Sequence, residues 1–289
     1  MWFQLKIEHC PVAELEELSE ELEEFGALSI MLTDKNDNPV LEPEPGTTPL
    51  WPEVIIQALF SEAMQAQFTR DSLSQNYPGL SFNLEVLEDR DWERAWMDDF
   101  KPQRFGKRLW ICPTWSTPPE PEAVNLMLDP GLAFGTGTHP TTALCLTWLE
   151  QAELNHKSVI DYGCGSGILS LAALKLGAAQ VYAVDIDQQA LQATQNNALT
   201  NTLNTRNLHV SFPDELSSPV NLVIANILLA PLITLKERFQ QLLQPEGQLV
   251  VSGLLSEQAP LLIAAYESLF LLVGQQELNG WSLLIFSRK

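Results

Sequence analysis

The chain has 289 residues, 45% of them hydrophobic, which is enough for one large domain or two modest ones. Its 37 acidic residues outnumber its 16 basic ones and give a net charge of −21, which disfavours bare nucleic acid and favours a basic partner, although solubility alone would also explain it. No stretch approaches the roughly 20 apolar residues that span a bilayer, and the start MWFQLKIEHC is too short and too polar for a signal peptide, so we expect no membrane segment.

Residues 1–89 carry most of the net negative charge, with 18 Asp and Glu against 3 Lys and Arg. Apolar residues at strand and helix spacing predict the order β-α-β-β-α-β, which is typical of a small ferredoxin-like α+β unit. The predicted strands lie near 3–7, 28–33, 54–60 and 80–86, and the predicted helices near 11–25 and 62–74. A proline-rich stretch occupies residues 36–52. Because the unit offers no catalytic constellation, we interpret 1–89 as a substrate-recognition domain.

Residues 90–106 are predicted to be a linker. The segment Asp91–Phe100 has the pattern of a short helix with Trp92 and Trp96 one turn apart, and packing explains this pair better than a ligand platform. Four basic residues follow at 101, 104, 107 and 108. We expect this linker to act as a hinge.

From residue 107 to residue 289, strands and helices alternate, which predicts a doubly wound, mostly parallel sheet. The predicted strands lie at 109–113, 126–129, 158–162, 180–185, 207–212, 220–225, 248–253, 270–276 and 281–287, and the helices near 140–151, 168–176, 187–200, 230–243 and 257–269. The last two strands flank Leu278-Asn-Gly280, so we expect an antiparallel hairpin at the edge of this sheet.

Residues 159–168 combine an apolar strand with a glycine-dense turn and the start of a helix, an arrangement that holds nucleotide-like cofactors. The glycines are Gly163, Gly165 and Gly167, whereas the dinucleotide fingerprint needs its third glycine at 168, where this chain has Ile. The spacing favours S-adenosylmethionine over NAD. Asp185 follows the next strand, 22 residues after Gly163, where an acid binds ribose hydroxyls. A purely structural tight turn is the alternative.

The run from Asp129 to Thr142 contains three glycines before a predicted helix start. It has no lysine, so it does not form a phosphate loop, and a cover over the cofactor fits better. His139 is either a base or a residue that makes a local hydrogen bond at the helix start. Cys164 is interpreted as a small side chain beside the cofactor rather than a nucleophile.

Asn226 ends the strand 222–225. An amide carbonyl there can accept a hydrogen bond from an attacking amine and aim its lone pair at a methyl sulfonium. The leaving group is a neutral thioether, so positioning supplies most of the catalysis. Asn226 is the candidate catalytic residue. The four cysteines (Cys10, Cys112, Cys145 and Cys164) show no zinc-ligand spacing, so we expect reduced thiols, a cytoplasmic protein and no metal.

Four motifs carry a resemblance over essentially the whole chain: GTGTHPTT at 135–142, DYGCGSGIL at 161–169, AVDID at 183–187 and NIL at 226–228. Together they resemble the PrmA family, bacterial methyltransferases of large-subunit ribosomal protein L-eleven. The glycine motif alone would indicate only a class I methyltransferase with a Rossmann-like fold.

The resemblance implies that Thr142, Gly163, Asp185 and Asn226 contact S-adenosylmethionine. It also implies that the N-terminal domain grips ribosomal protein L-eleven, and that lysine and N-terminal amines of that protein are methylated. We expect no direct binding to DNA. Other functions stay open. The chain could be a class I methyltransferase that acts on RNA or on another basic protein. It could also be an NAD-dependent dehydrogenase, or a binding protein that uses the cofactor as a structural ligand.

Overall fold

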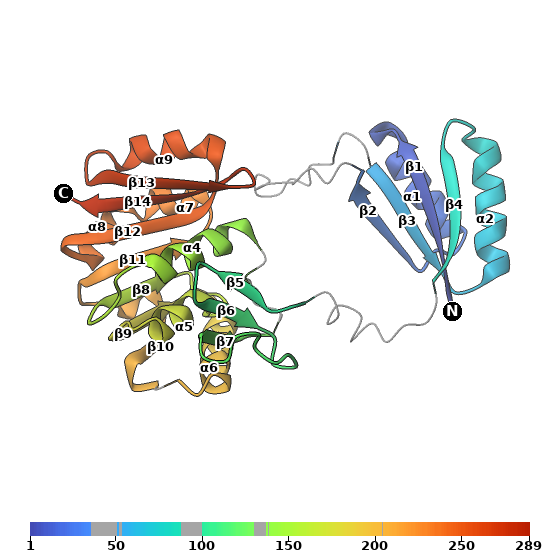
Figure 1. Ribbon diagram of the computed structural model, residues 1–289. Coiled ribbons are helices and arrows are strands. Elements are labelled where there is room, and N and C mark those ends of the chain that lie inside the picture. Colours follow the sequence, from blue (N-terminus) through green and yellow to red (C-terminus); the bar gives the residue numbers. More distant parts are fainter. Residues whose placement is uncertain (36–50, 52–53, 88–99, 130–136, 138, 204) are drawn as a thin grey trace. The chain divides into compact units, whose positions relative to one another are not determined.

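The computed structural model describes residues 1–35, 51, 54–87, 100–129, 137, 139–203 and 205–289 (Figure 1). The chain forms two compact units, Met1–Trp96 and Met97–Lys289. Among the described residues, no helix combines the length and the apolar character needed to cross a membrane. The predicted helix at Asp91–Phe100, apart from Phe100 itself, lies outside the described residues, as does most of the proline-rich stretch.

The first unit has the predicted β-α-β-β-α-β order. Its four-stranded antiparallel sheet has the order β2-β3-β1-β4, which is that of a ferredoxin-like unit. The elements are β1 (Trp2–Cys10), α1 (Leu15–Glu24) after a 3₁₀ turn (Val12–Glu14), β2 (Ser29–Asp34), β3 (Val54–Phe60), α2 (Ala63–Asn76) and β4 (Ser81–Leu87). Leu5 and Ile7 of β1 pack in one core with Leu18 and Leu22 of α1 and Leu73 of α2.

The acidic side of α1 faces solvent. Leu18 and Leu22 are fully buried, whereas Glu16, Glu17 and Glu20 are exposed and, among the described residues, take part in no ion pair. Basic side chains of this unit form ion pairs with other carboxylates. Lys6 lies 2.8 Å from Glu8, and Arg70 lies 2.7 Å from Asp71.

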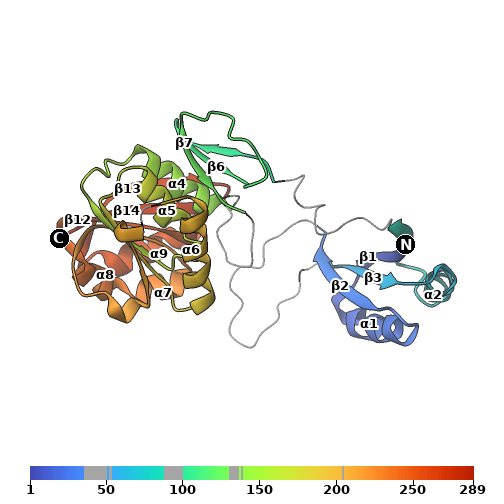
Figure 2. The ribbon, with the colours of Figure 1, turned by 90° about the horizontal axis from the view of Figure 1, so that it is seen from below.

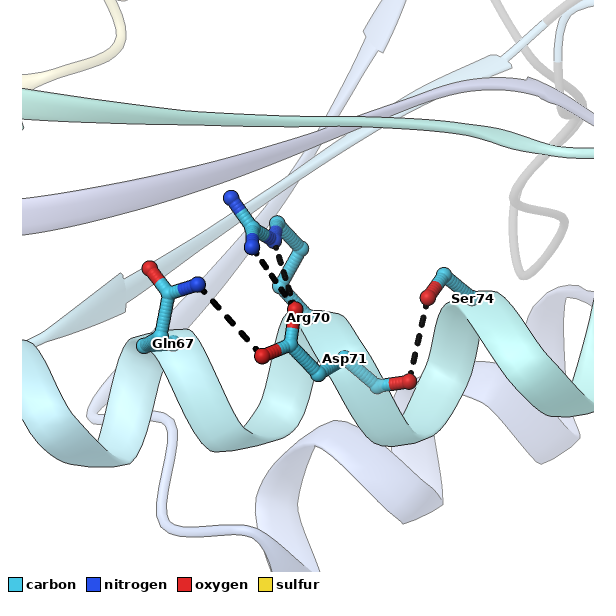
Figure 3. Close-up of polar contacts among 4 residues, drawn as sticks. All are labelled: Gln67, Arg70, Asp71 and Ser74. Atoms are coloured by element: carbon cyan, nitrogen blue, oxygen red, sulfur yellow. Dashed lines mark hydrogen bonds and ion pairs between the residues drawn. The ribbon is translucent and has the colours of Figure 1, made fainter.

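The second of these pairs lies on the exposed side of α2 (Figure 3). Arg70 donates through Nε and Nη2 to Oδ1 of Asp71, and Gln67 donates to Oδ2 at 3.4 Å. Ser74 Oγ donates to the Asp71 backbone carbonyl at 3.0 Å. A surface pair of this kind adds little stability, but it neutralises a cation. The negative surface of the first unit lies instead along α1, where Glu16, Glu17 and Glu20 are exposed.

The second unit is built on a seven-stranded sheet in the order β10-β9-β8-β11-β12-β14-β13. The strands are β8 (Ser158–Tyr162), β9 (Gln180–Val184), β10 (Leu208–Ser211), β11 (Val220–Asn226), β12 (Leu243–Leu255), β13 (Phe270–Leu278) and β14 (Trp281–Arg288). The first five of these strands run parallel, and β14 pairs antiparallel with β12. The predicted antiparallel hairpin is confirmed, with β13 at the edge.

Helices cover both faces of this sheet (Figures 1 and 2). One face carries α4 (Pro140–Gln151), α5 (Ile168–Lys175) and α6 (Gln188–Thr200), and the other carries α7 (Leu229–Thr234), α8 (Lys236–Leu242) and α9 (Ala259–Tyr266). Each face has its own buried apolar cluster. Side chains alternate along β8, so Val159 joins the first cluster and Ile160 the second.

Two expectations for this unit are wrong in detail. The helix expected near 230–243 is broken at Leu235 into α7 and α8, which periodicity does not mark because apolar residues continue through the break. The strands expected at 109–113 and 126–129 do not join the large sheet. They form a separate three-stranded sheet with a strand that lies within the predicted linker: β5 (Gln103–Phe105), β6 (Leu109–Cys112) and β7 (Val124–Met127).

The small sheet lies apart because its apolar side chains pack against helices. Phe105, Ile111 and Leu126 are buried in the same cluster as residues of α4 and α5. Arg108, after β5, has its Nε 3.4 Å from the buried Glu150 carboxylate of α4. The end of the predicted linker is therefore fixed to the second unit.

Candidate functional site

The carboxyl ends of β8, β9 and β11 open into one pocket. These strands are neighbours and parallel, so the segments that follow them gather at the same edge of the sheet. The pocket has a volume of about 370 Å³. It is lined by Thr142, Tyr162, Gly163, Cys164, Gly165, Ile168, Leu169, Asp185, Ile186, Pro213, Asn226, Ile227, Leu228, Pro231 and Leu235. All five residues predicted to bind the cofactor (Thr142, Gly163, Gly165, Asp185 and Asn226) lie in this lining.

The glycine turn after β8 is held by backbone hydrogen bonds. The N–H groups of Gly163 and Cys164 both donate to the Val184 carbonyl, at 2.8 and 3.0 Å. Gly163 has φ +82°, and a Cβ at this position would lie 2.4 Å from Cγ2 of Ile227. The positive φ and the short distance from an added Cβ to Ile227 both require glycine at this position. Because glycine has no side chain, its backbone lines the pocket directly.

Two side chains of helix α6 donate hydrogen bonds to the same turn. Thr194 Oγ1 donates to the Gly165 carbonyl at 3.1 Å, and Asn197 Nδ2 donates to the Ser166 carbonyl at 2.8 Å. A Cβ on Gly167 would lie 2.7 Å from Thr194 side-chain atoms. Thr194 and Asn197 were not predicted from the sequence. The sequence shows only two polar residues three positions apart in a helix, and this pattern does not indicate which groups they bind.

Asp185 follows β9 and is half-buried. Its Oδ2 accepts a hydrogen bond from the Gly165 N–H at 3.0 Å, and its Oδ1 accepts one from the Asp187 N–H at 3.0 Å. These bonds fix the plane of the carboxylate against the glycine turn. Each oxygen retains a further lone pair, so the group can also accept hydrogen bonds from a diol in the pocket.

Asn226 and Thr142 meet at the opposite wall of the pocket lining. Asn226 is the last residue of β11, and its Nδ2 donates to Oγ1 of the buried Thr142 in α4 at 3.3 Å. Asn226 Oδ1 is buried and accepts no hydrogen bond from any described residue. An orphaned buried acceptor is costly, and a bound molecule with an N–H group would satisfy it.

His139 is the N-cap of α4. Its Nδ1 accepts a hydrogen bond from the Thr141 N–H at 3.3 Å and lies 2.7 Å from Thr141 Oγ1. Burial lowers the pKa of His139, and its ring contacts Trp281 edge to face at 4.6 Å between centroids. The local hydrogen bond expected at the helix start is therefore present. The rest of the glycine-containing run before it, residues 130–136 and 138, lies outside the described residues.

Cys164 behaves as a small buried side chain. Burial, together with the nearby Asp161 charge, strongly raises the pKa of its thiol, and its Sγ lies 3.4 Å from Thr194 Oγ1. A thiol of this kind stays protonated and unreactive at neutral pH. All four cysteines are buried free thiols.

The pocket fits an adenosyl group attached to a charged, flexible chain. It offers a carboxylate for a ribose, backbone bordered by glycine, and apolar walls from Ile186, Pro213 and Leu228. Pro213 and Leu235 line it without having been predicted, because they follow β10 and α7 with no motif around them. The glycine at 163, where a Cβ would lie 2.4 Å from Ile227 Cγ2, also matches a ligand that needs close approach to the backbone.

Comparisons with known proteins agree with this fold. Residues 1–289 match the family model described as ribosomal protein L11 (L-eleven) methyltransferase, PrmA. Proteins of the same description are 70% identical over the full length of both chains in Legionella pneumophila strain Corby, and 48% identical over 292 residues in Nitrosococcus oceani, covering 100% of this chain and 99% of that protein.

A crystal structure of ribosomal protein L11 methylase from Lactobacillus delbrueckii subsp. bulgaricus is also similar, at 32% identity and a TM-score of 0.61. The match covers 66% of this chain and 100% of that chain. The chain therefore belongs to the ribosomal protein L11 methyltransferase family.

Proposed function

We propose that this protein transfers methyl groups from S-adenosylmethionine to lysine side chains and to the N-terminal amine of ribosomal protein L11. Family membership over all 289 residues supports the reaction and the substrate. The observation in the structure that carries the proposal is the buried Asn226 Oδ1, an acceptor without a partner among the described residues, at the wall of a cofactor-sized pocket. The residues below are assigned on this basis.

Asp185 and the glycine turn are proposed to bind the cofactor. The Asp185 carboxylate is fixed by the Gly165 and Asp187 N–H groups and accepts hydrogen bonds from the ribose hydroxyls. Gly163 and Gly165 keep the backbone free of side chains where the amino-acid part of the ligand lies. The cofactor supplies a methyl group on a sulfonium, whose departure leaves a neutral thioether.

Asn226 is proposed to orient the attacking amine, and Thr142 to hold Asn226. Because Thr142 Oγ1 engages Nδ2, the carbonyl half of the amide is left to accept a hydrogen bond from the amine N–H. This contact directs the nitrogen lone pair at the methyl carbon. Positioning of this kind can supply up to roughly 7–11 kcal/mol of the barrier reduction, without a residue that transfers a proton to the leaving group.

We propose that residues 1–89 recognise the substrate, that residues 90–106 are the linker, whose last residues form β5 and pack on the second unit, and that residues 107–289 carry out catalysis. The exposed glutamates of α1, which have no ion-pair partner among the described residues, support binding to a basic ribosomal protein. Four buried free thiols support a cytoplasmic location.

The cofactor and the substrate can be tested separately. Calorimetric titration of the full chain with S-adenosylmethionine and with NADH decides the cofactor, and we expect binding of the first alone. Labelled methyl transfer to L11, to another basic ribosomal protein and to ribosomal RNA, each offered alone, decides the acceptor. Transfer to RNA or to the other protein, with none to L11, would replace the proposal by the alternative: a class I methyltransferase acting on RNA or on another basic protein.

A further inference from the structure

Asp161 is a buried carboxylate to which the proposed function gives no role. It precedes Tyr162 at the end of β8, is 1% exposed, and is followed directly by four residues that line the pocket, 162–165. Its Oδ2 accepts two hydrogen bonds from Ser170 of α5, from N–H at 2.9 Å and from Oγ at 2.7 Å. The pair closes the glycine turn between strand and helix.

Burying the charge of Asp161 costs free energy, because the second oxygen of its carboxylate has no hydrogen-bond partner in the described chain. Oδ1 of Asp161 is buried and accepts no hydrogen bond from any described residue. Burial raises the pKa of Asp161 to about 6, so the group is still mostly ionised at neutral pH. A neutral amide could accept the bond from the Ser170 N–H without burying a charge. A brace alone therefore does not explain a carboxylate here.

The charge of Asp161 acts on groups in the pocket wall. Besides burial, it raises the pKa of Cys164, which lines the pocket, and the charge of Asp185 in turn raises the pKa of Asp161. The Asp161 charge also raises the pKa of Cys145 in α4, and both thiols stay protonated. None of the charged groups acting on Asp161 in the described part of the chain is a cation. Asp161 and Asp185 therefore place two carboxylates beside the glycine turn that lines the pocket.

We propose that the Asp161 carboxylate makes the pocket select a cationic sulfonium over the neutral thioether that methyl transfer leaves behind. The inference rests on the proposed function, because it concerns the donor and product of that reaction. The donor carries a sulfonium and an ammonium against one carboxylate, and the product has lost the sulfonium charge. A fixed negative charge beneath the pocket attracts the donor more strongly. Asp161 thus favours capture of the donor and release of the product, while Ser170 holds the carboxylate in place.

The test compares equilibrium binding of S-adenosylmethionine and S-adenosylhomocysteine to the full chain by calorimetry. For Asp161→Asn we expect about tenfold weaker binding of the sulfonium and less than about threefold weaker binding of the thioether. Ser170→Ala is the matched control, because it removes one donor and keeps the charge. It should leave the ratio of the two dissociation constants unchanged even where both constants rise.

Equal loss of both ligands in Asp161→Asn would overturn the inference and reduce Asp161 to a brace. If that variant does not fold, the wild-type protein decides, because the preference for the sulfonium should fall as Asp161 is protonated from about pH 7 to about pH 5. A preference that is constant over this range would also overturn the inference. Wild-type protein that binds neither ligand would overturn the proposed function itself, whereas binding of both with an unaltered ratio in the variant overturns only the role of Asp161.

Discussion

Asn226 Nδ2 donates to Thr142 Oγ1 at 3.3 Å, and this bond joins the carboxyl end of β11 to the first turn of α4 across 84 residues of sequence. It occupies the donor half of the amide and leaves the buried carbonyl oxygen without a partner in the described chain. The geometry suits a residue that must present an acceptor in one fixed orientation.

Replacing Asn226 by Ala should reduce turnover at least as much as it reduces cofactor affinity. The reason is that the amine loses its orienting contact, and a misplacement of roughly 1 Å can cost about 10²-fold in rate. Thr142→Val keeps the amide but frees it to rotate, so its loss of turnover should be smaller. Single-turnover kinetics and calorimetric titration measure the two quantities. Unchanged turnover in Asn226→Ala would remove the role assigned to it.

Asp185→Ala should weaken cofactor binding by roughly 1–3 kcal/mol, the usual cost of unmade buried hydrogen bonds. Asp187→Ala is the control, because Asp187 lies two residues away and caps α6 by accepting from the Gln189 N–H at 2.9 Å. It should cost about 1 kcal/mol of stability with little effect on affinity. Calorimetry and chemical unfolding separate the two effects, and similar affinities in both variants would contradict the ribose assignment.

Gly163→Ala should lose both stability and cofactor binding. Its φ of +82° is unfavourable for alanine, and its Cβ would lie 2.4 Å from Ile227 Cγ2. Gly280→Ala has a similar φ of +80° with no atom within 4 Å of the added Cβ, so it carries the backbone strain alone. The difference between the two variants in unfolding free energy measures the clash. Ile227→Ala should restore part of the loss in Gly163→Ala, and a failure to do so would mean that the clash is not with Ile227.

The sequence was most informative at positions where the local geometry demands one particular residue type. The glycine turn, the acid after β9 and the amide at the end of β11 lie in one pocket lining, as expected of residues at the carboxyl ends of neighbouring apolar strands. Thr194 and Asn197 of α6, which brace that turn, escaped prediction, since a polar side chain in a helix carries no signal of its partner 29 to 31 residues away. The same holds for the bond between Asp161 and Ser170.

The fold, like the site, was predictable from the sequence only in part. The order of elements was evident from periodicity, whereas the separate sheet β5-β6-β7 was not, because a short apolar run looks the same in either sheet. What places it apart is the packing of Phe105 and Leu126 against the helical side of the large core. That choice depends on tertiary contacts.

Asp161 should make folding stability depend on pH. Its pKa in the folded protein, about 6, exceeds the ordinary value of 3.8, so the folded state binds the proton more tightly. The stability that this group contributes is therefore complete below about pH 4 and is lost as the pH rises through about 6, a change of roughly 3 kcal/mol at most. Asp161→Asn lacks this term. In urea unfolding, its stability relative to wild type should rise between about pH 5 and pH 7, and a constant difference would contradict the raised pKa.

The acidic side of α1 should control substrate affinity rather than chemistry. Changing Glu16, Glu17 and Glu20 to Gln should raise KM for L11 severalfold and weaken its salt dependence, with kcat and cofactor affinity unchanged. A control with the same change in net charge, at the exposed Glu246, Glu257 and Glu267 of the second unit, should leave KM nearly unaltered. Equal effects of the two triple variants would indicate that only the overall charge matters.

The central claim is amine methylation of L11, and the most direct test is to incubate the purified protein with labelled S-adenosylmethionine and unmethylated L11 and to map the label by mass spectrometry. The account predicts label on lysine side chains and on the N-terminal amine, and its loss in Asn226→Ala. Cofactor binding without label on those amines would contradict the assigned substrate.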